Sequence, residues 1–148
     1  MKTIDIEDFF TEDNEDSGVW FEPKIRDVNG DLVPCGLEFL VTGKNTDENI
    51  AGTERYEKHL QELEDMKDPI EKAKKQKELD ANRVAEFVKG LRVVDGYKVN
   101  FGGKEIEYSK PLVQKIFLKS PLIKIEVINF VMKTANFIKR EKSDSKKQ

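Results

Sequence analysis

The side chains best suited to nucleophilic catalysis are a single cysteine, Cys35, and a single histidine, His59, in a chain of 148 residues. A catalytic nucleophile needs a base such as histidine within hydrogen-bond reach. Cys35 follows Pro34 in an extended stretch, His59 belongs to a helical stretch, and the sequence has no Gly-x-Ser-x-Gly motif. We therefore predict that the chain is not an enzyme, that Cys35 is a small structural residue and that His59 lies on the surface.

Four oxygen-bearing residues have the spacing of positions 1, 3, 5 and 12 in a calcium-binding loop: Asp27, Asn29, Asp31 and Glu38. Position 6 is Leu32, where the sharp bend of such a loop needs glycine. A tight turn at Asn29-Gly30 explains the same residues better. One cysteine also excludes a multi-cysteine zinc site. We therefore expect no metal and no cofactor.

Aromatic residues among basic ones suggest a third chemistry, base stacking in a single-stranded nucleic-acid binder. Tyr97, Phe101 and Tyr108 lie next to the basic last third of the chain. The overall pI of about 5.4, however, disfavours a phosphate-binding surface. We expect these rings to pack together against the last helix, and we do not expect nucleic acid as a partner.

Charge is distributed unevenly. Residues 1–50 carry four Lys and Arg against thirteen Asp and Glu, whereas residues 101–148 carry eleven against five. We interpret most of this charge as solvated surface, although the polarity would also suit head-to-tail self-association. No apolar run reaches the roughly 18–20 residues of a membrane span, and the first residues lack a signal-peptide pattern. We expect a soluble protein of a reducing compartment without a membrane partner.

Secondary-structure signals place these residues on an acidic arm (1–17), a single α+β domain (18–138) and a lysine-rich flexible tail (139–148). The arm could be a short helix ending near Glu12, or it could become ordered only against a partner. Strand-like residues then flank Asn29-Gly30, which as a two-residue turn would place Trp20 opposite Phe39. Pro23 and Pro34 predict an outer edge or a bulged pairing there.

Residues 47–82 predict a charged helical hairpin that projects from the core or lies over it. Tyr56, Leu60 and Leu63 recur at spacings of four and three and form its one apolar stripe. Asp68-Pro69 marks the start of the second helix, which we expect to continue to about Lys89.

A second β-hairpin is predicted around Gly102-Gly103, with strands over residues 97–101 and 104–108. This register pairs three sets of residues: Tyr97 with Tyr108, Val99 with Ile106, and Lys98 with Glu107. A pair of C-terminal helices follows, beginning at Ser109 and at Ser120-Pro121. Residues 122–131 are apolar around more than half of the second helix, so this helix is either central or partly exposed and sticky.

Several short segments occur in a recognisable order: Gly-Val-Trp-Phe-Glu-Pro at 18–23, Leu-Glu-Phe-Leu-Val-Thr-Gly-Lys-Asn-Thr-Asp-Glu at 37–48, Val-Lys-Gly-Leu at 88–91, Asp-Gly-Tyr at 95–97, Ser-Pro-Leu-Ile at 120–123, Ile-Asn-Phe-Val at 128–131 and Ala-Asn-Phe at 135–137. With the charged hairpin between them, they resemble the tail assembly chaperones of long-tailed bacteriophages, in particular phages of Gram-positive hosts. The resemblance runs from about Gly18 to Phe137. Leu91 departs from it, because tryptophan is expected there.

The resemblance implies a protein without catalysis that binds the long tape measure protein while tail tube subunits polymerise around it. Such a protein works in the host cell cytoplasm and is absent from the mature virion. We expect the partner-binding residues in the arm and the helical hairpin: Phe9, Phe10, Tyr56, Leu60 and Leu63. The alternatives are a small structural or adaptor protein of the phage tail and, third, the single-stranded nucleic-acid binder.

Overall fold

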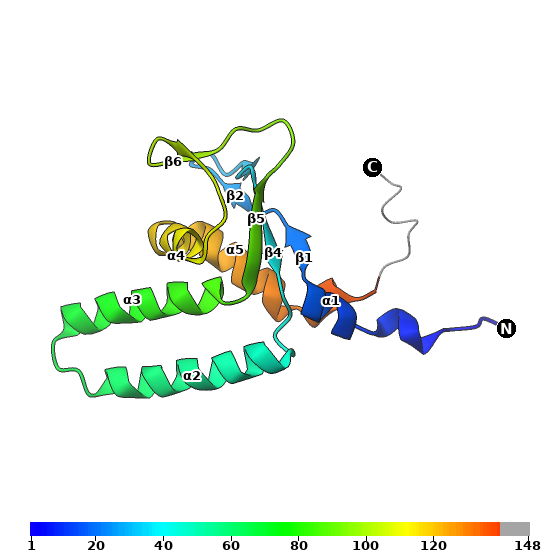
Figure 1. The fold of residues 1–148 in the computed structure, drawn as a ribbon, viewed down its shortest axis with the longest axis horizontal. Helices are drawn as coiled ribbons and strands as arrows, with labels where there is room; N and C mark the ends of the chain where they lie inside the picture. Colours follow the sequence, from blue (N-terminus) through cyan, green and yellow to red (C-terminus); the bar gives the residue numbers. More distant parts are fainter. Residues whose placement is uncertain (140–148) are drawn as a thin grey trace.

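The computed structural model describes residues 1–139, so the predicted lysine-rich tail falls outside the described residues except for Lys139. The predicted α+β class is confirmed, because helices pack beside small antiparallel sheets (Figure 1). The main sheet has the order β1-β4-β5, formed by β1 (Val19–Phe21), β4 (Leu37–Val41) and β5 (Val88–Val93).

β4 is the central strand, and its side chains alternate between the two faces of the sheet. Leu37, Phe39 and Val41 are buried on one face, whereas Glu38 and Leu40 are half-buried on the other. On that second face the guanidinium carbon of Arg92 lies 3.9 Å from the ring centroid of Trp20, and its Nε donates to Glu38 at 3.0 Å. The first face therefore carries the core.

The first predicted hairpin divides into two ladders. β2 (Lys24–Arg26) pairs with β3 (Leu32–Pro34), while β1 pairs with β4. The expected two-residue turn is wrong. The Asp27 amide donates to the Asp31 carbonyl at 2.9 Å, so three residues (28–30) form the turn between them, and Gly30 takes a positive φ of 82°. Trp20 faces Leu40 and not Phe39, because two residues (22–23) separate the two ladders on one side and four (35–38) on the other, which shifts the register. An outer edge or a bulged pairing was predicted at the two prolines, and the pairing is irregular there: Pro23 lies between β1 and β2, and Pro34 is the last paired residue of β3.

The predicted helical hairpin consists of α2 (Asp47–Glu64) and α3 (Pro69–Ala85), which extend together away from the sheet (Figure 1). The Thr46 hydroxyl accepts from the Asn49 amide and caps α2, and the Asp68 carboxylate accepts from the Ile70 amide and caps α3. In Figure 1, α3 lies between α2 and α4, so α2 is the outer helix.

The prediction that the second hairpin helix reaches Lys89 is wrong. α3 ends at Ala85, and residues 88–93 form β5, an edge strand on β4. The run from Val84 to Leu91 is apolar enough for either a buried helix or a buried strand. Pairing with the central strand decides between them, and the β-branched Val88 and Val93 suit the pleated sheet.

The second predicted hairpin is much shorter than expected. β6 (Asn100–Phe101) and β7 (Lys104–Glu105) have the predicted register around Gly102-Gly103. The ladder ends after these two pairs, so the predicted pairs Tyr97–Tyr108, Val99–Ile106 and Lys98–Glu107 do not form part of it. The Tyr97 amide donates instead to the Val94 carbonyl in a turn.

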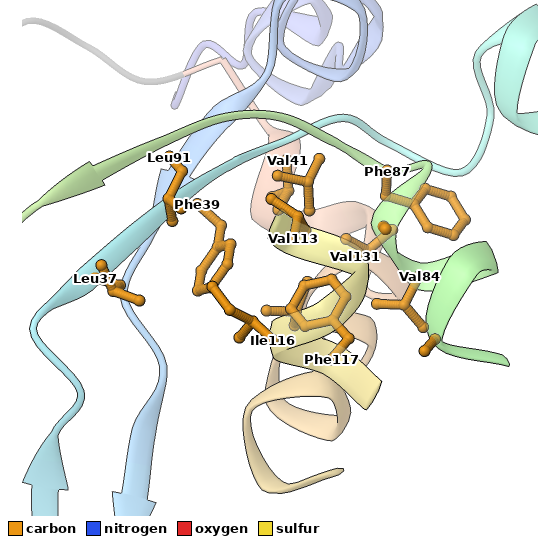
Figure 2. Packing of buried hydrophobic residues seen from close by; sticks show 14 of the residues in the cluster. Leu37, Phe39, Val41, Val84, Phe87, Leu91, Val113, Ile116, Phe117 and Val131 are labelled. Carbon is orange, nitrogen blue, oxygen red and sulfur yellow. The ribbon is translucent and has the colours of Figure 1, made fainter. Parts of the chain in front are cut away.

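The predicted C-terminal helical pair is α4 (Lys110–Lys119) and α5 (Pro121–Met132), each capped by a serine hydroxyl, and a short 3-10 turn η2 (Thr134–Phe137) follows. Figure 2 shows side chains of the sheet pointing toward those of α4, α5 and the end of α3. Phe39 and Phe117 lie at the centre of this core, with ring centroids 5.4 Å apart.

The second part of the predicted acidic arm packs against the body of the protein. The arm contains the 3-10 turn η1 (Ile6–Phe9) and the helix α1 (Glu12–Ser17), so the expectation of a helix ending near Glu12 is wrong. α1 contacts η2, and the Asn14 side chain donates to the Ile138 carbonyl at 3.2 Å. The boundary predicted at residue 17/18 therefore separates α1 from the body against which it packs.

Core burial predicts different effects for two phenylalanine replacements. Phe39→Ala should lower the free energy of unfolding by about 3–5 kcal/mol, because it leaves a cavity beside Phe117. Phe10→Ala, at an exposed position, should change it by less than about 0.5 kcal/mol. Urea denaturation of both variants measures the difference, and similar losses for the two would contradict this core assignment.

Candidate interaction surfaces

A buried polar network joins α1, the sheet and the helical hairpin. It contains the four buried polar or charged residues recorded for the described chain: Glu15, Thr42, Asn49 and Arg83. The Asn49 amide donates to the Thr42 hydroxyl at 2.9 Å and to the Gly43 carbonyl at 2.6 Å. The Thr42 hydroxyl in turn donates to the Phe87 carbonyl at 3.1 Å. Asn49 thus ties the first turn of α2 to the segment that follows β4.

Arg83 joins the two helices of the hairpin. Its Nη2 donates to the Asn49 carbonyl at 2.9 Å and to the Thr53 hydroxyl at 2.8 Å, while Nη1 donates to Glu86 at 2.9 Å. The guanidinium carbon also lies 4.2 Å from the ring centroid of Phe87. These partners satisfy the buried charge and fix the angle at which the hairpin leaves the sheet.

Glu15 connects α1 to the same region. Its carboxylate accepts from the Asn45 backbone and side-chain amides, at 3.1 and 3.0 Å, and from the Thr11 hydroxyl at 2.7 Å. The Gly43 amide donates to the Glu15 carbonyl, and a Cβ at Gly43 would overlap the Glu15 side chain. Glycine at this position therefore allows α1 to dock.

An acidic cleft of about 440 Å³ opens between α1 and the start of α2. Glu48 on its wall accepts from the Lys89 ammonium at 2.6 Å, and this hydrogen bond lowers the pKa of Glu48. The remaining acidic lining residues are Glu12, Glu15, Asp16 and Asp47. The ion pair links α2 to the edge strand β5.

The residues considered for chemistry belong to separate parts of the fold. Cys35 follows β3, where its thiol donates to the Leu37 carbonyl and burial raises its pKa, whereas His59 is exposed on α2. The Asp27 carboxylate accepts from the Asn29 and Asp31 amides at 2.9 and 3.0 Å, so it serves the turn. Among residues 1–139, no group of three His, Cys, Asp or Glu side chains has the geometry to hold a metal ion.

The apolar stripe of the hairpin lies largely between its own helices. Tyr56 donates its hydroxyl to Asp80 on α3 at 2.6 Å, and Leu60 and Leu63 are half-buried. Burial and the bond to Asp80 raise the pKa of Tyr56 to about 12. The structure therefore gives these three residues a role in joining α2 to α3.

Phe9 and Phe10 lie apart from that stripe, on the N-terminal segment (residues 1–10), with 58% and 57% of their surface exposed. Ile4 and Ile6 on the same segment are more exposed still. The Lys139 amide donates to the Phe10 carbonyl at 3.0 Å, which places the end of this segment beside the last described residue. The five predicted partner-binding residues thus form two separate groups.

A further apolar surface lies on α5, the helix for which the sequence left open a central or a partly exposed position. Leu122, Ile125 and Met132, here called the α5 strip, are 60%, 47% and 41% exposed. The sequence signal was the apolar character around most of this helix. The expectation for the aromatic residues before α4 is also corrected: Tyr97 and Tyr108 are exposed, and only Phe101 packs against the core.

No helix of residues 1–139 is long and apolar enough to cross a membrane. No protein-family model matches the chain, and neither a curated protein nor a solved structure shows significant similarity to it.

The network predicts that Arg83 contributes more to the free energy of unfolding than the nearby Arg55. Arg83→Met should lower the free energy of unfolding by about 2–3 kcal/mol, because it leaves the buried Asn49 carbonyl and Thr53 hydroxyl without their donor. Arg55→Met is the matched control, since Arg55 is exposed and approaches Glu86 only to 4.0 Å. Chemical denaturation should show less than about 0.5 kcal/mol for the control. Equal losses would refute the role of Arg83.

The hydrogen bond between Tyr56 and Asp80 is predicted to make a pH-dependent contribution to the free energy of unfolding. An unfolded tyrosine titrates near pH 10, whereas folding raises the pKa of Tyr56 to about 12. The stabilisation is therefore complete below about pH 10 and lost as the pH rises toward about 12. At about pH 8, Tyr56→Phe should be less stable than the wild type by about 1 kcal/mol.

The pH dependence of that difference is measured by urea denaturation of both proteins between about pH 8 and pH 12. The difference should shrink over the upper two units of this range. Tyr97→Phe, at an exposed ring, controls for loss of a hydroxyl group. A difference that stays constant through about pH 12 would show that the bond does not hold the phenol neutral.

Proposed function

We propose that the chain binds other proteins through exposed apolar side chains and serves as a tail assembly chaperone of a long-tailed bacteriophage. The client is the tape measure protein, held in the host cytoplasm while tail tube subunits assemble, and the chaperone leaves before the virion is complete. The observation that supports this proposal best is the N-terminal segment, on which five large apolar side chains are exposed: Met1, Ile4, Ile6, Phe9 and Phe10.

A protein that holds an aggregation-prone client needs displayed apolar surface together with charge that opposes further association. The N-terminal segment combines both, because Asp5, Glu7 and Asp8 alternate with its apolar residues. Its Phe side chains offer much contact area for few rotatable bonds. This segment is therefore the preferred client surface, ahead of the hairpin stripe, which is engaged between α2 and α3.

A nucleic-acid-binding function has one specific observation in its favour. Tyr97 and Tyr108 are exposed and could stack on bases, and Lys115 lies 5.6 Å from the ring centroid of Phe101. This alternative predicts co-purifying nucleic acid that is released by salt. The adaptor alternative predicts a fixed copy number in purified virions.

Affinity capture of the tagged chain from phage-producing cells tests the chaperone proposal. The wild type should recover a very long tail protein and tube subunits. The double variant Phe9→Ser, Phe10→Ser should recover at least about tenfold less of the long protein. The matched control is Val28→Ser, Leu32→Ser, a pair of exposed apolar residues on the β2–β3 hairpin, which should recover wild-type amounts.

Mass spectrometry of the captured proteins and of purified virions separates the three functions. Recovery of assembled tail components only, with the chain present in virions, would favour the adaptor. Nucleic acid as the sole partner would favour the third function. Undiminished capture by the Phe9, Phe10 variant would remove the N-terminal segment as the client surface.

A further inference from the structure

Helix α5 has apolar residues on two opposite faces. Val127 and Val131 are fully buried toward the core. Successive residues of an α-helix turn by about 100°, so the members of the α5 strip fall within about a quarter of the circumference, opposite the two valines. Their exposure shows that residues 1–139 leave this second face largely uncovered. Apart from the exposed Asn129 between Ile125 and Met132, this second face is apolar, and such a face suits the packing of a further element.

The surroundings of the α5 strip are basic. Lys119 and Lys133, at the two ends of α5, are both exposed, and Lys124 lies within the helix. Glu126 is the one acidic residue in α4 and α5. A segment that covers the strip should therefore carry apolar anchors and negative charge.

The N-terminal segment has this composition. Ile6 and Phe9 lie three residues apart in η1, a spacing that puts them on the same side of a 3-10 turn, and Phe10 follows. Phe10 is the C-cap of η1 and has extended backbone, so Ile6 and Phe9 share a side of the turn and Phe10 continues the apolar stretch along the chain. The acidic residues around them are Asp5, Glu7 and Asp8, and Lys2 is the one basic residue of the segment.

The segment is held away from the strip of its own chain. The Glu15 hydrogen bonds fix α1 beside the start of α2, and the Lys139 amide is bonded to the Phe10 carbonyl. In Figure 1 the N-terminus extends to the side of the molecule opposite α4 and the beginning of α5. A second copy of the chain can supply both surfaces without disturbing these bonds.

We propose that the N-terminal segment of one copy binds the α5 strip of a second copy. Ile6, Phe9 and Phe10 cover the strip, and the acidic residues of the segment lie against the lysines at its rim. The contact is head to tail, because two different surfaces meet. It goes beyond the proposed function and does not depend on it, since it concerns the purified chain without any client.

Sedimentation velocity of the purified full chain, from about 1 μM to about 1 mM, tests the proposal. The wild type should associate with increasing concentration, and added salt should weaken the association. The segment variant Phe9→Ser, Phe10→Ser and the strip variant Leu122→Ser, Ile125→Ser should each raise the dissociation constant at least about tenfold. Val28→Ser, Leu32→Ser should behave as the wild type.

A mixture of the two defective variants gives the sharper test. The segment variant keeps an intact strip and the strip variant keeps an intact segment, so the two should form a complex of limited size with each other. All substituted residues are exposed, and urea denaturation should show wild-type stability for each variant.

Three results would overturn the proposal. The first is a wild-type chain that stays monomeric to about 1 mM. The second is a mixture of the two variants that fails to associate. The third is association weakened by the strip variant alone, which would indicate that α5 pairs with α5 of the second copy. None of these results would decide whether the chain captures the tape measure protein, which the affinity-capture experiment tests separately.

Discussion

Arg83 occupies the point where the helical hairpin meets the sheet, and its guanidinium group bonds to both α2 and the end of α3. A buried arginine is costly unless its donors are satisfied, and here two neutral oxygens, one carboxylate and one aromatic ring surround it. Asn49 extends the same bonding to the segment after β4. The position of the hairpin therefore depends on a few directional bonds, because α2 itself buries little apolar surface.

Because hydrogen bonds of Arg83 and Asn49 hold the helical hairpin, apolar side chains elsewhere on the chain are left exposed. The side chains Tyr56, Leu60 and Leu63 serve the contact between α2 and α3, and the core takes one face of the sheet with parts of α3, α4 and α5. Exposed apolar residues then gather on the N-terminal segment, on the α5 strip and on the β2–β3 hairpin, where Val28, Leu32 and Val33 are exposed. If both proposals hold, a client and a second copy compete for the same phenylalanines. Self-association would cover them until a client with higher affinity displaces the second copy.

The elements with strong local signals were predictable from the sequence. Asp68-Pro69 marked the start of α3, and Gly102-Gly103 fixed the register of β6 and β7. β5 was missed because Val84 to Leu91 is apolar at both helical and strand periods, so only the pairing with β4 distinguishes them. The register of Trp20 was wrong by one residue because residues 35–38 between the two ladders outnumber residues 22–23 on the other side, an irregularity that the turn signal at Asn29-Gly30 does not reveal.

The candidate surfaces were harder to predict, because exposure depends on tertiary contacts. Residues 122–131 were seen to be apolar around more than half of the helix, but the sequence does not say which face is covered. Glu15 is one of many acidic residues near the N-terminus, and nothing local distinguishes the carboxylate that accepts from Asn45. Phe9 and Phe10 were placed on the N-terminal arm, but the sequence did not predict the 3-10 turn that ends at Phe9.

The contact between α1 and the C-terminal part of the chain has a consequence for biosynthesis. Asn14 donates to the carbonyl of Ile138, 124 residues later in the sequence, and the Phe10 carbonyl accepts from Lys139. A ribosome releases the N-terminal part of a chain first, so α1 emerges long before these partners exist. The Glu15 bonds to Asn45 can form early, but the remaining bonds must wait until residues 138 and 139 have been synthesised. During translation, Phe9 and Phe10 are therefore available to the neighbouring nascent chains of a polysome before the body of their own molecule has closed.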